Sequence, residues 1–449
     1  MSTSLHEQAE ALQQGRTSSL ELTEAALARA ADPSGEGARV FTKRYAERAR
    51  AAARASDLMR QAGLPRSPID GLPVSIKDLF DVAGEATPAG SAVLRDAAPA
   101  AAHAVVVQRL LGAGAVLVGR TNMTEFAYSG LGINPHYGTP LNPWDRATGR
   151  IPGGSSSGAA VSVTDGMASA AIGSDTGGSV RIPAALCGLT GFKPSAQRVP
   201  MDGVLPLSVN LDSLGPLAPT VRCCATMDAV LSGDAGPLPE PAALRGLRLA
   251  VPTTLALEGM DDHVAASFAA TLTKLSEAGA QIDHVEISEF AQLGQINAKG
   301  GFTAAEAWAW HRDLIGRSAD QYDPRVVSRI RRGQDITAAD WIELMAARQA
   351  WIASVQRRIA GYDALVLPTV PVVAPAVSAL VESDALYGST NLLILRNPTL
   401  INFLDGCALS VPCHEAGSAP VGLMIAGANG ADRRILSIGM AVEDLLATH

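Results

Sequence analysis

The chain has 449 residues, of which 47% are hydrophobic and 18% are charged, a composition that excludes an intrinsically disordered protein. Its 36 basic and 44 acidic residues give a formal net charge of -8, so the field of the molecule repels phosphate backbones and excludes nucleic acid as a general partner. No run of 18 or more apolar residues is present, which predicts a soluble globular protein without a membrane partner.

The amino-terminal segment and the cysteines indicate the compartment. The first residues, MSTSLHEQAEALQQG, lack the basic and apolar regions of a secretory signal. The five cysteines are odd in number and form no C-x-x-C pair. We therefore expect reduced thiols and a cytoplasmic location.

Helix and strand patterns alternate through the first half of the chain, which is typical of an α/β protein. Ser18 and Glu21 have the S-x-x-E spacing of a capping box, which predicts the start of a helix. Gly, Pro, Asn and Ser are dense over 130–158, where we expect an ordered functional loop. The other elements expected in this half are a helix over 44–62, a buried strand within 69–84, a helix over 104–111, a strand over 115–119, a helix over 159–169 and a loop over 173–183.

The second half begins with a predicted linker, the run GPLPEPAAL after Asp234. Four of the five tryptophans lie between Trp308 and Arg358, in a stretch that we expect to be helical and to form part of a pocket. The other elements expected here are a strand over 247–251, an amphipathic helix over 262–277, a strand over 364–368 and a hairpin of 408–412 with 421–425.

Some patterns resemble functional motifs but lack the context that those motifs need. GAGAVL at 112–117 lacks the third glycine of a dinucleotide fingerprint and precedes a strand. Residues 154–158 match G-x-S-x-G around Ser156, yet the preceding segment is a poor strand end for a nucleophile elbow. The eight histidines have no metal-ligand spacing, so neither a metal site nor a Ser-His-Asp triad is expected.

Two Ser/Gly loops, at 153–158 and 173–183, are the strongest remaining candidates for a site. Gly177 and Gly178 can turn successive backbone N–H groups toward one point beside Ser179, which would suit an oxyanion. A plain tight turn is the alternative interpretation. A serine nucleophile needs a base, and an amine can serve where burial lowers its pKa from about 10.4. Lys77, in an apolar setting, is the candidate base, although a lone lysine is more often a solvated surface charge.

With these motifs, the chain resembles the amidase signature family of serine hydrolases, which uses a Ser-cisSer-Lys triad. The resemblance covers most of the chain. The matching segments are GLPVSIKD at 71–78, TPAGS at 87–91, GRTNMTEFA at 119–127, GTPLNPWD at 138–145, both Ser/Gly loops, GLTGFKPS at 188–195, LDSLGPLA at 211–218, DALVLPT at 363–369, and the closing SVPC and PVGLMIAG.

The resemblance implies roles for individual residues. Ser179 would be the nucleophile, Ser155 the bridging serine after a cis peptide bond, and Lys77 the base that receives the proton. The implied oxyanion hole consists of the backbone N–H groups of Thr176, Gly177, Gly178 and Ser179. Asp175 and Arg181 flank the nucleophile loop, and we expect them to form a structural ion pair that fixes the loop.

The resemblance also implies a fold, a single α/β domain over 1–449 with a large mixed β-sheet covered on both faces by α-helices. Within it we expect a catalytic core over 60–230, a helical cover of the pocket over 231–362, and a C-terminal part over 363–449 that completes the sheet. Members of the family often form homodimers, so a homodimer is a further expectation.

The implied function is hydrolysis of a small-molecule carboxamide to a carboxylate and ammonia or an amine, without a cofactor. One alternative is the glutaminase (A-type) subunit of a tRNA-dependent amidotransferase, which needs a partner subunit; RNPTLIN at 396–402 does not resemble the acidic segment expected for glutamine. An inactive binding scaffold is another alternative. Phe126, Ala127 and Tyr128 are candidate substrate-pocket residues, with 300–360 and Arg396 as candidate cover; each could equally be structural.

Overall fold

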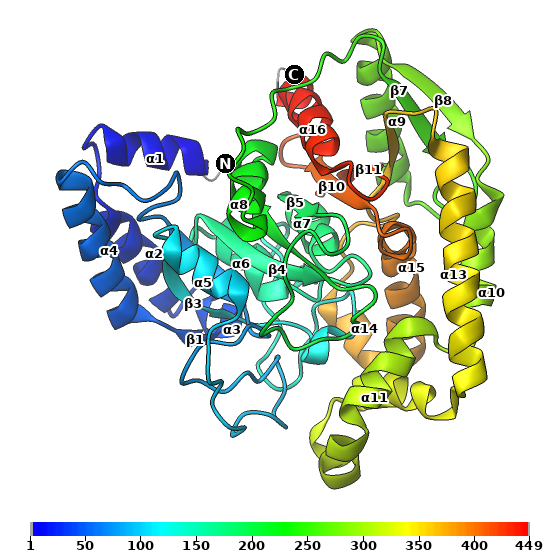
Figure 1. Ribbon diagram of the computed structural model, residues 1–449, viewed down its shortest axis with the longest axis horizontal. Helices are drawn as coiled ribbons and strands as arrows, with labels where there is room; N and C mark the ends of the chain where they lie inside the picture. The colour runs from blue at the N-terminus through cyan, green and yellow to red at the C-terminus, as the bar shows by residue number, and fades with distance from the viewer. Residues whose placement is uncertain (1–2, 448–449) are drawn as a thin grey trace.

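The computed structural model describes residues 3–447 and is built around one eleven-stranded β-sheet (Figure 1). The strands are β1 (Phe41–Arg44), β2 (Pro73–Lys77), β3 (Val116–Thr121), β4 (Ala170–Asp175), β5 (Thr190–Lys193), β6 (Ser213–Ala218), β7 (Arg248–Pro252), β8 (Gln281–Val285), β9 (Ala364–Pro368), β10 (Cys407–Pro412) and β11 (Gly422–Gly427). Their order in the sheet is β1-β3-β2-β4-β6-β5-β10-β11-β9-β7-β8. The pairs β2–β3, β2–β4, β7–β8 and β7–β9 are parallel and the others antiparallel, which confirms the expected mixed sheet.

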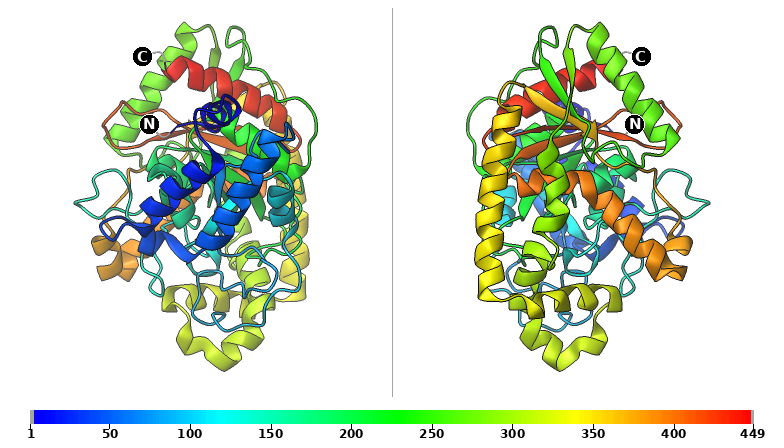
Figure 2. Two further views of the ribbon diagram at one scale, coloured as in Figure 1. Left: turned by 90° about the vertical axis from the view of Figure 1, so that its left-hand side faces the viewer. Right: turned by 90° about the vertical axis from the view of Figure 1, so that its right-hand side faces the viewer.

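Helices cover both faces of this sheet (Figures 1 and 2). Along β11, Leu423 and Ile425 belong to one buried cluster and Met424 and Ala426 to another, because successive side chains of a strand point to opposite faces. A strand buried on both faces has a nearly continuous apolar sequence, as GLMIAG has. The helices are α1 (Leu5–Gln13), α2 (Ser19–Ala31), α3 (Gly37–Val40), α4 (Ala46–Gln61), α5 (Val105–Gly112), α6 (Ser157–Thr164), α7 (Arg181–Cys187), α8 (Val221–Ser232), α9 (Asp262–Glu277), α10 (Leu293–Ile296), α11 (Gly301–Ser318), α12 (Pro324–Arg331), α13 (Ala338–Ile359), α14 (Val377–Glu382), α15 (Asp384–Phe403) and α16 (Asp432–Ala447).

Most of the elements expected from the sequence are confirmed. Helix α2 begins after the capping box of Ser18 and Glu21, whose side chains each accept a hydrogen bond from the other residue's backbone N–H. Strands β10 and β11 form the expected antiparallel hairpin. The other confirmed elements are α4, β2, α5, β3, β7, α9 and β9, each within a few residues of its predicted range.

The loop expected over 173–183 is present but covers only 176–180, because β4 ends at Asp175 and α7 begins at Arg181. Pro183 lies in the first turn of α7, where a helix tolerates proline, so it did not mark a loop. The helix expected over 159–169 is α6, which ends earlier, at Thr164, just before Gly166 with its positive φ of 66°.

The helical cover consists of α11, α12 and α13, which confirms the helical prediction for 308–358. In Figure 1, α13 runs along the side of the molecule opposite α1, α2 and α4, and α11 lies at the lower end. Helix α13 starts at a capping box of Thr337 and Asp340, and Trp351 on it packs in the same cluster as Leu365 of β9. The cover therefore shares a hydrophobic core with the sheet.

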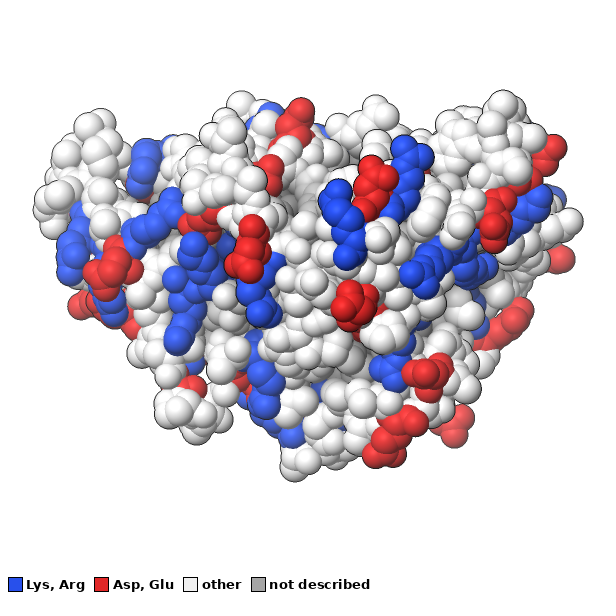
Figure 3. Space-filling view, turned by 90° about the horizontal axis from the view of Figure 1, so that it is seen from below, with Lys and Arg blue, Asp and Glu red and all other residues white. Residues whose placement is uncertain are grey.

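The surface carries charged side chains, and the described helices are not of the membrane-spanning kind. Seen from below, basic and acidic side chains are interspersed over the visible face (Figure 3). In the described part of the chain, no helix combines the length and the apolar character needed to cross a lipid bilayer.

Candidate active site

A buried lysine stands at the carboxyl end of β2, the third strand in the order of the sheet. Alternation along the strand places Val74 and Ile76 in the core on one face, while the Ser75 Oγ lies 2.8 Å from the Ser162 Oγ of α6 on the other. Lys77 is two residues beyond Ser75, so its side chain lies on the α6 side of the sheet. Its exposed fraction is 0%.

The Lys77 amine contacts two serine hydroxyls. Its Nζ donates to Ser155 Oγ at 2.7 Å and to Ser174 Oγ at 2.8 Å. Burial lowers the pKa of Lys77 to about 7, although the charges of Asp175 and Asp212 act to raise that pKa. A large share of this amine is therefore neutral near pH 7 and can accept a proton.

Ser155 lies in the loop that precedes α6, and the peptide bond between Gly154 and Ser155 is cis, as expected. A Cβ at Gly154 would lie 2.5 Å from the backbone nitrogen of Gly132, so only glycine permits this approach of the two segments. The next residue, Ser156, donates its N–H to the Ser179 carbonyl at 3.2 Å, which joins the two Ser/Gly loops. Ser156 is the N-cap of α6 and no strand directly precedes it, so the G-x-S-x-G match is not a nucleophile elbow.

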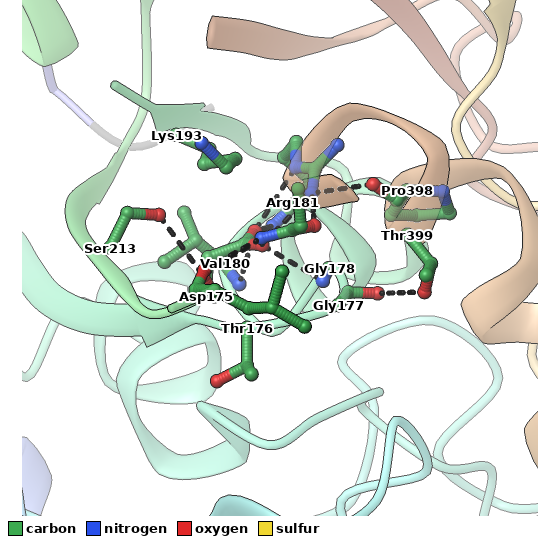
Figure 4. Close-up of polar contacts among 12 residues, drawn as sticks. Asp175, Thr176, Gly177, Gly178, Val180, Arg181, Lys193, Ser213, Pro398 and Thr399 are labelled. Atoms are coloured by element: carbon green, nitrogen blue, oxygen red, sulfur yellow. Dashed lines mark hydrogen bonds and ion pairs between the residues drawn. The ribbon is translucent and has the colours of Figure 1, made fainter. Parts of the chain in front are cut away.

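A buried ion pair fixes the loop that carries Ser179. Asp175 and Arg181 are each 0% exposed, and Arg181 NH2 donates to Asp175 Oδ1 at 2.8 Å (Figure 4). Asn402 of α15 donates to the same oxygen at 2.9 Å. Burial acts to raise the pKa of Asp175, but Arg181, Lys193 and Asn402 outweigh it and hold that pKa well below its ordinary value. This confirms the pair as structural, since it ties β4 to α7.

The backbone N–H groups of the loop differ in their availability. The Gly178 N–H donates to Asp175 Oδ1 at 2.8 Å, so it is not free for an oxyanion, contrary to the expected set of four (Figure 4). The N–H groups of Thr176, Gly177 and Ser179 donate no hydrogen bond within residues 3–447. We therefore retain these three as the candidate oxyanion hole.

Asp212 holds one side of this loop, a role that the sequence did not indicate. Its carboxylate accepts the hydroxyl of Thr176 and the N–H groups of Leu207 and Ser208, the latter two at 3.0 Å and 3.1 Å. Burial raises the pKa of Asp212 to about 6 despite these hydrogen bonds. The position of Thr176 thus depends on an acidic group that sequence patterns alone do not connect to it.

Ser179 opens onto a cavity of about 680 Å³. Thr176, Gly177 and Ser179 line it, as do Ala127 and Tyr128, which the sequence suggested as candidate pocket residues. The third candidate of that group, Phe126, does not line this cavity. It is 1% exposed and its ring packs edge-on against His311, with the centroids 4.4 Å apart. Phe126 is a core residue because the positive φ at 126 and 127 turns the chain between the core and the cavity.

The cover contributes the remaining walls, as expected for 300–360 and Arg396. Phe302 and Thr303 of α11, and Arg329 of α12, line the cavity together with Arg396. Sequence reasoning missed α15, which supplies Arg396 and further lining residues. Pro398 within α15 breaks the apolar pattern that would have indicated a helix. Those further residues are Asn391, Leu392, Leu393, Leu395 and Thr399.

The cysteine, histidine and acidic side chains form no disulfide and no metal site in the described structure. The five cysteines are all unpaired. Over residues 3–447, no group of three or more His, Cys, Asp or Glu side chains is arranged to hold a metal ion.

The amidase family model matches residues 21–436. The chain belongs to the amidase family. It is 37% identical to the 2-amino-5-chloromuconic acid deaminase of Comamonas testosteroni, over 89% of this chain and 87% of that protein. It is 34% identical to the A subunit of the glutamyl-tRNA(Gln) amidotransferase of Chloroflexus aggregans, over 98% of this chain and 95% of that protein.

A solved structure described as an amidase has a TM-score of 0.88 to this chain at 32% identity, covering 98% of this chain and 99% of that one. The chain is therefore an enzyme of a family that acts on amide C–N bonds. The relatives include both a small-molecule enzyme and a component of a transferase.

Proposed function

We propose that this amidase hydrolyses the carboxamide of a small molecule to a carboxylate and ammonia or an amine, through an acyl-enzyme on Ser179. The observation that carries the proposal is the fully buried amine of Lys77, held 2.7 Å from the Ser155 hydroxyl near a cavity that Ser179 lines. A serine in such a setting has a proton acceptor through a second hydroxyl and needs no histidine.

The proposed order of steps combines the Lys77–Ser155 contact with the relay that the family resemblance implies for Ser155 and Ser179. Neutral Lys77 accepts a proton from Ser155, Ser155 accepts one from Ser179, and the Ser179 Oγ attacks the amide carbonyl carbon. The oxyanion of the tetrahedral intermediate lies against the free N–H groups of Thr176, Gly177 and Ser179. The C–N bond then breaks as the proton returns through Ser155 to the leaving nitrogen. Water attacks the resulting ester by the same proton path and releases the carboxylate.

The glutaminase subunit of an amidotransferase is the second candidate, and the relative from Chloroflexus aggregans favours it. Glutamine carries an ammonium as well as a carboxylate. Within the described part of the chain, no Asp or Glu side chain lines the cavity to receive that ammonium. A small-molecule amide without a cationic group therefore fits the cavity better than glutamine does.

The test measures ammonia and amine release from aliphatic amides, benzamide, indoleacetamide, allophanate and glutamine. We expect turnover of a non-glutamine amide, and a loss of roughly 10⁴-fold or more in kcat for Ser179→Ala. Ser156→Ala is the matched control from the neighbouring loop, and it should retain most of the activity. Activity that survives Ser179→Ala, or glutamine hydrolysis that appears only with an added partner protein, would contradict the proposal.

A further inference from the structure

The cavity above Ser179 is lined by positive charge alone. Its charged lining residues are Arg329, Arg332 and Arg396, and no acidic side chain of residues 3–447 lines it. This local excess contrasts with the formal net charge of -8 of the whole chain. A concave site with one sign of charge and low-dielectric walls concentrates ligands of the opposite sign.

Two of these arginines lie one helical turn apart. Arg329 is in α12 and Arg332 directly follows it, so the i, i+3 spacing places both side chains on one face. Arg329 NH1 donates to the Tyr128 carbonyl at 2.7 Å, and its guanidinium lies 5.4 Å from the centroid of the Tyr387 ring. These contacts fix Arg329 at the cavity wall and leave other donors of its guanidinium free.

Arg332 adds an unengaged guanidinium to this wall. Its side chain forms no hydrogen bond or ion pair with any other described residue, and Arg329 likewise has no carboxylate within ion-pair distance. A guanidinium presents a planar fork of donors that matches the two oxygens of a carboxylate. The pair therefore offers guanidinium donors that could bind an anionic group.

Arg396 supplies positive charge from α15. It is half-buried and donates to the Ala256 carbonyl at 3.2 Å and to Asn397 Oδ1 at 3.1 Å, both of them neutral acceptors. The charge of Glu258 acts on Arg396, but Glu258 does not line the cavity. The remaining walls are largely apolar, with Leu211 and Phe302 among them, and they suit a hydrocarbon or aromatic body.

We propose that the amide substrate carries a carboxylate, which Arg329 and Arg332 bind while Arg396 adds a favourable field, on an otherwise apolar body. The inference deepens the proposed function and rests on it for turnover. The substrate class is the monoamide of a dicarboxylic acid, with one end at Ser179 and the other at the arginines. The same charges disfavour amides that carry a cationic group and no carboxylate.

Three amides of matched length test the charge preference: adipamic acid, hexanamide and 6-aminohexanamide. Because a charge-assisted hydrogen bond contributes enough for about a tenfold to hundredfold preference, kcat/KM for adipamic acid should exceed that for hexanamide by this factor. The cationic amide should be the poorest of the three. Equal kcat/KM values for the charged and neutral amides would overturn the inference and leave the amidase proposal intact.

Substitutions then assign the preference to the arginines. Arg332→Gln and Arg329→Gln should each reduce the ratio of kcat/KM between adipamic acid and hexanamide by about tenfold, mainly through KM for the acid. Arg312→Gln removes an exposed arginine of α11 outside the cavity and should leave that ratio unchanged. A ratio that is the same in all four proteins would overturn the assignment.

Binding without turnover separates the two proposals. Titration calorimetry of Ser179→Ala with adipamic acid should show binding at least tenfold tighter than with hexanamide, and addition of Arg332→Gln should reduce this preference about tenfold. If adipamic acid binds more tightly but the unaltered chain hydrolyses no amide, the carboxylate site is supported and the amidase proposal is refuted. Equal binding of the two amides would refute the carboxylate site even if both are hydrolysed.

Discussion

The function of Lys77 depends on its protonation state, which burial sets. The pKa of this amine is lowered to about 7, so the base is protonated below pH 7 and neutral above it. If Lys77 is the base, kcat/KM should rise about tenfold per pH unit below pH 7 and level off above it. A pH–rate profile over pH 5.5–9 measures this limb. A flat profile across that range would contradict the assignment.

Titration of Asp212 could also make kcat/KM rise with pH between about pH 5 and 7, because its own pKa is raised to about 6. The charge of Asp212 also raises the pKa of Lys77, so Asp212→Asn should move a limb due to Lys77 to lower pH. The same pH–rate profile, recorded on this variant, distinguishes the two residues. If kcat/KM of Asp212→Asn no longer rises with pH, the rise belongs to Asp212 and not to Lys77.

Lys77→Met should abolish activity at every pH without loss of folding.

At this scale, the sequence predicted roles for Lys77, Ser155 and Ser179 only through their combination and the family resemblance. It could not show that Gly178 donates its N–H to Asp175, because that bond depends on the path of a five-residue loop. Phe126 was misplaced for a similar reason. Phe126 faces the core while Ala127 and Tyr128 face the cavity, because of the positive φ angles at 126 and 127, which the sequence does not reveal.

At the scale of elements, β4, α7 and α15 are joined by one buried charged group. Arg181 on α7 binds Asp175 at the end of β4 and also donates to Asn402 of α15. Arg181→Leu would leave the Asp175 carboxylate buried and unpaired, so we expect the free energy of unfolding to fall by about 3–5 kcal/mol. Urea unfolding of the variant measures this loss.

An exposed ion pair provides the matched control. Arg434 and Asp363 are 2.8 Å apart with side-chain exposures of 47% and 32%, and Arg434→Leu should change the free energy of unfolding by at most about 1 kcal/mol. Similar losses in the two variants would show that burial of the Asp175 pair does not matter. The control thus separates the effect of burial from that of losing an arginine.

Two of the strands that the sequence analysis did not predict share a physical cause. β4 and β5 are short, contain glycine and are buried on both faces, so they show neither alternation nor a long apolar run. α15 contains Pro398 in its interior. Helices α2 and α9 were predicted because each has an exposed face, so their patterns reflect contact with water as well as with the core.

At the scale of the whole molecule, the sheet and the helical cover form a common core. Trp351 and Val355 of α13 lie in one buried cluster with Leu367 of β9 and Met424 of β11. The sheet itself is continuous, because β10 near the C-terminus pairs with β5 (Thr190–Lys193) from the first half of the chain. The division of the chain at residues 231 and 363 remains a sequence-based prediction. The segments 231–362 and 363–449 both contribute residues to this cluster.

This shared core predicts that the cover does not unfold separately. Four of the five tryptophans lie in the cover, and Trp144→Phe would remove the fifth, so fluorescence of that variant reports on the cover alone. Far-UV circular dichroism reports mainly on helices and strands throughout the chain. Because separation of the cover would expose the apolar cluster around Trp351, we expect both signals to change at one urea concentration. A fluorescence transition that precedes the dichroism transition would show instead that the cover is an independent folding unit.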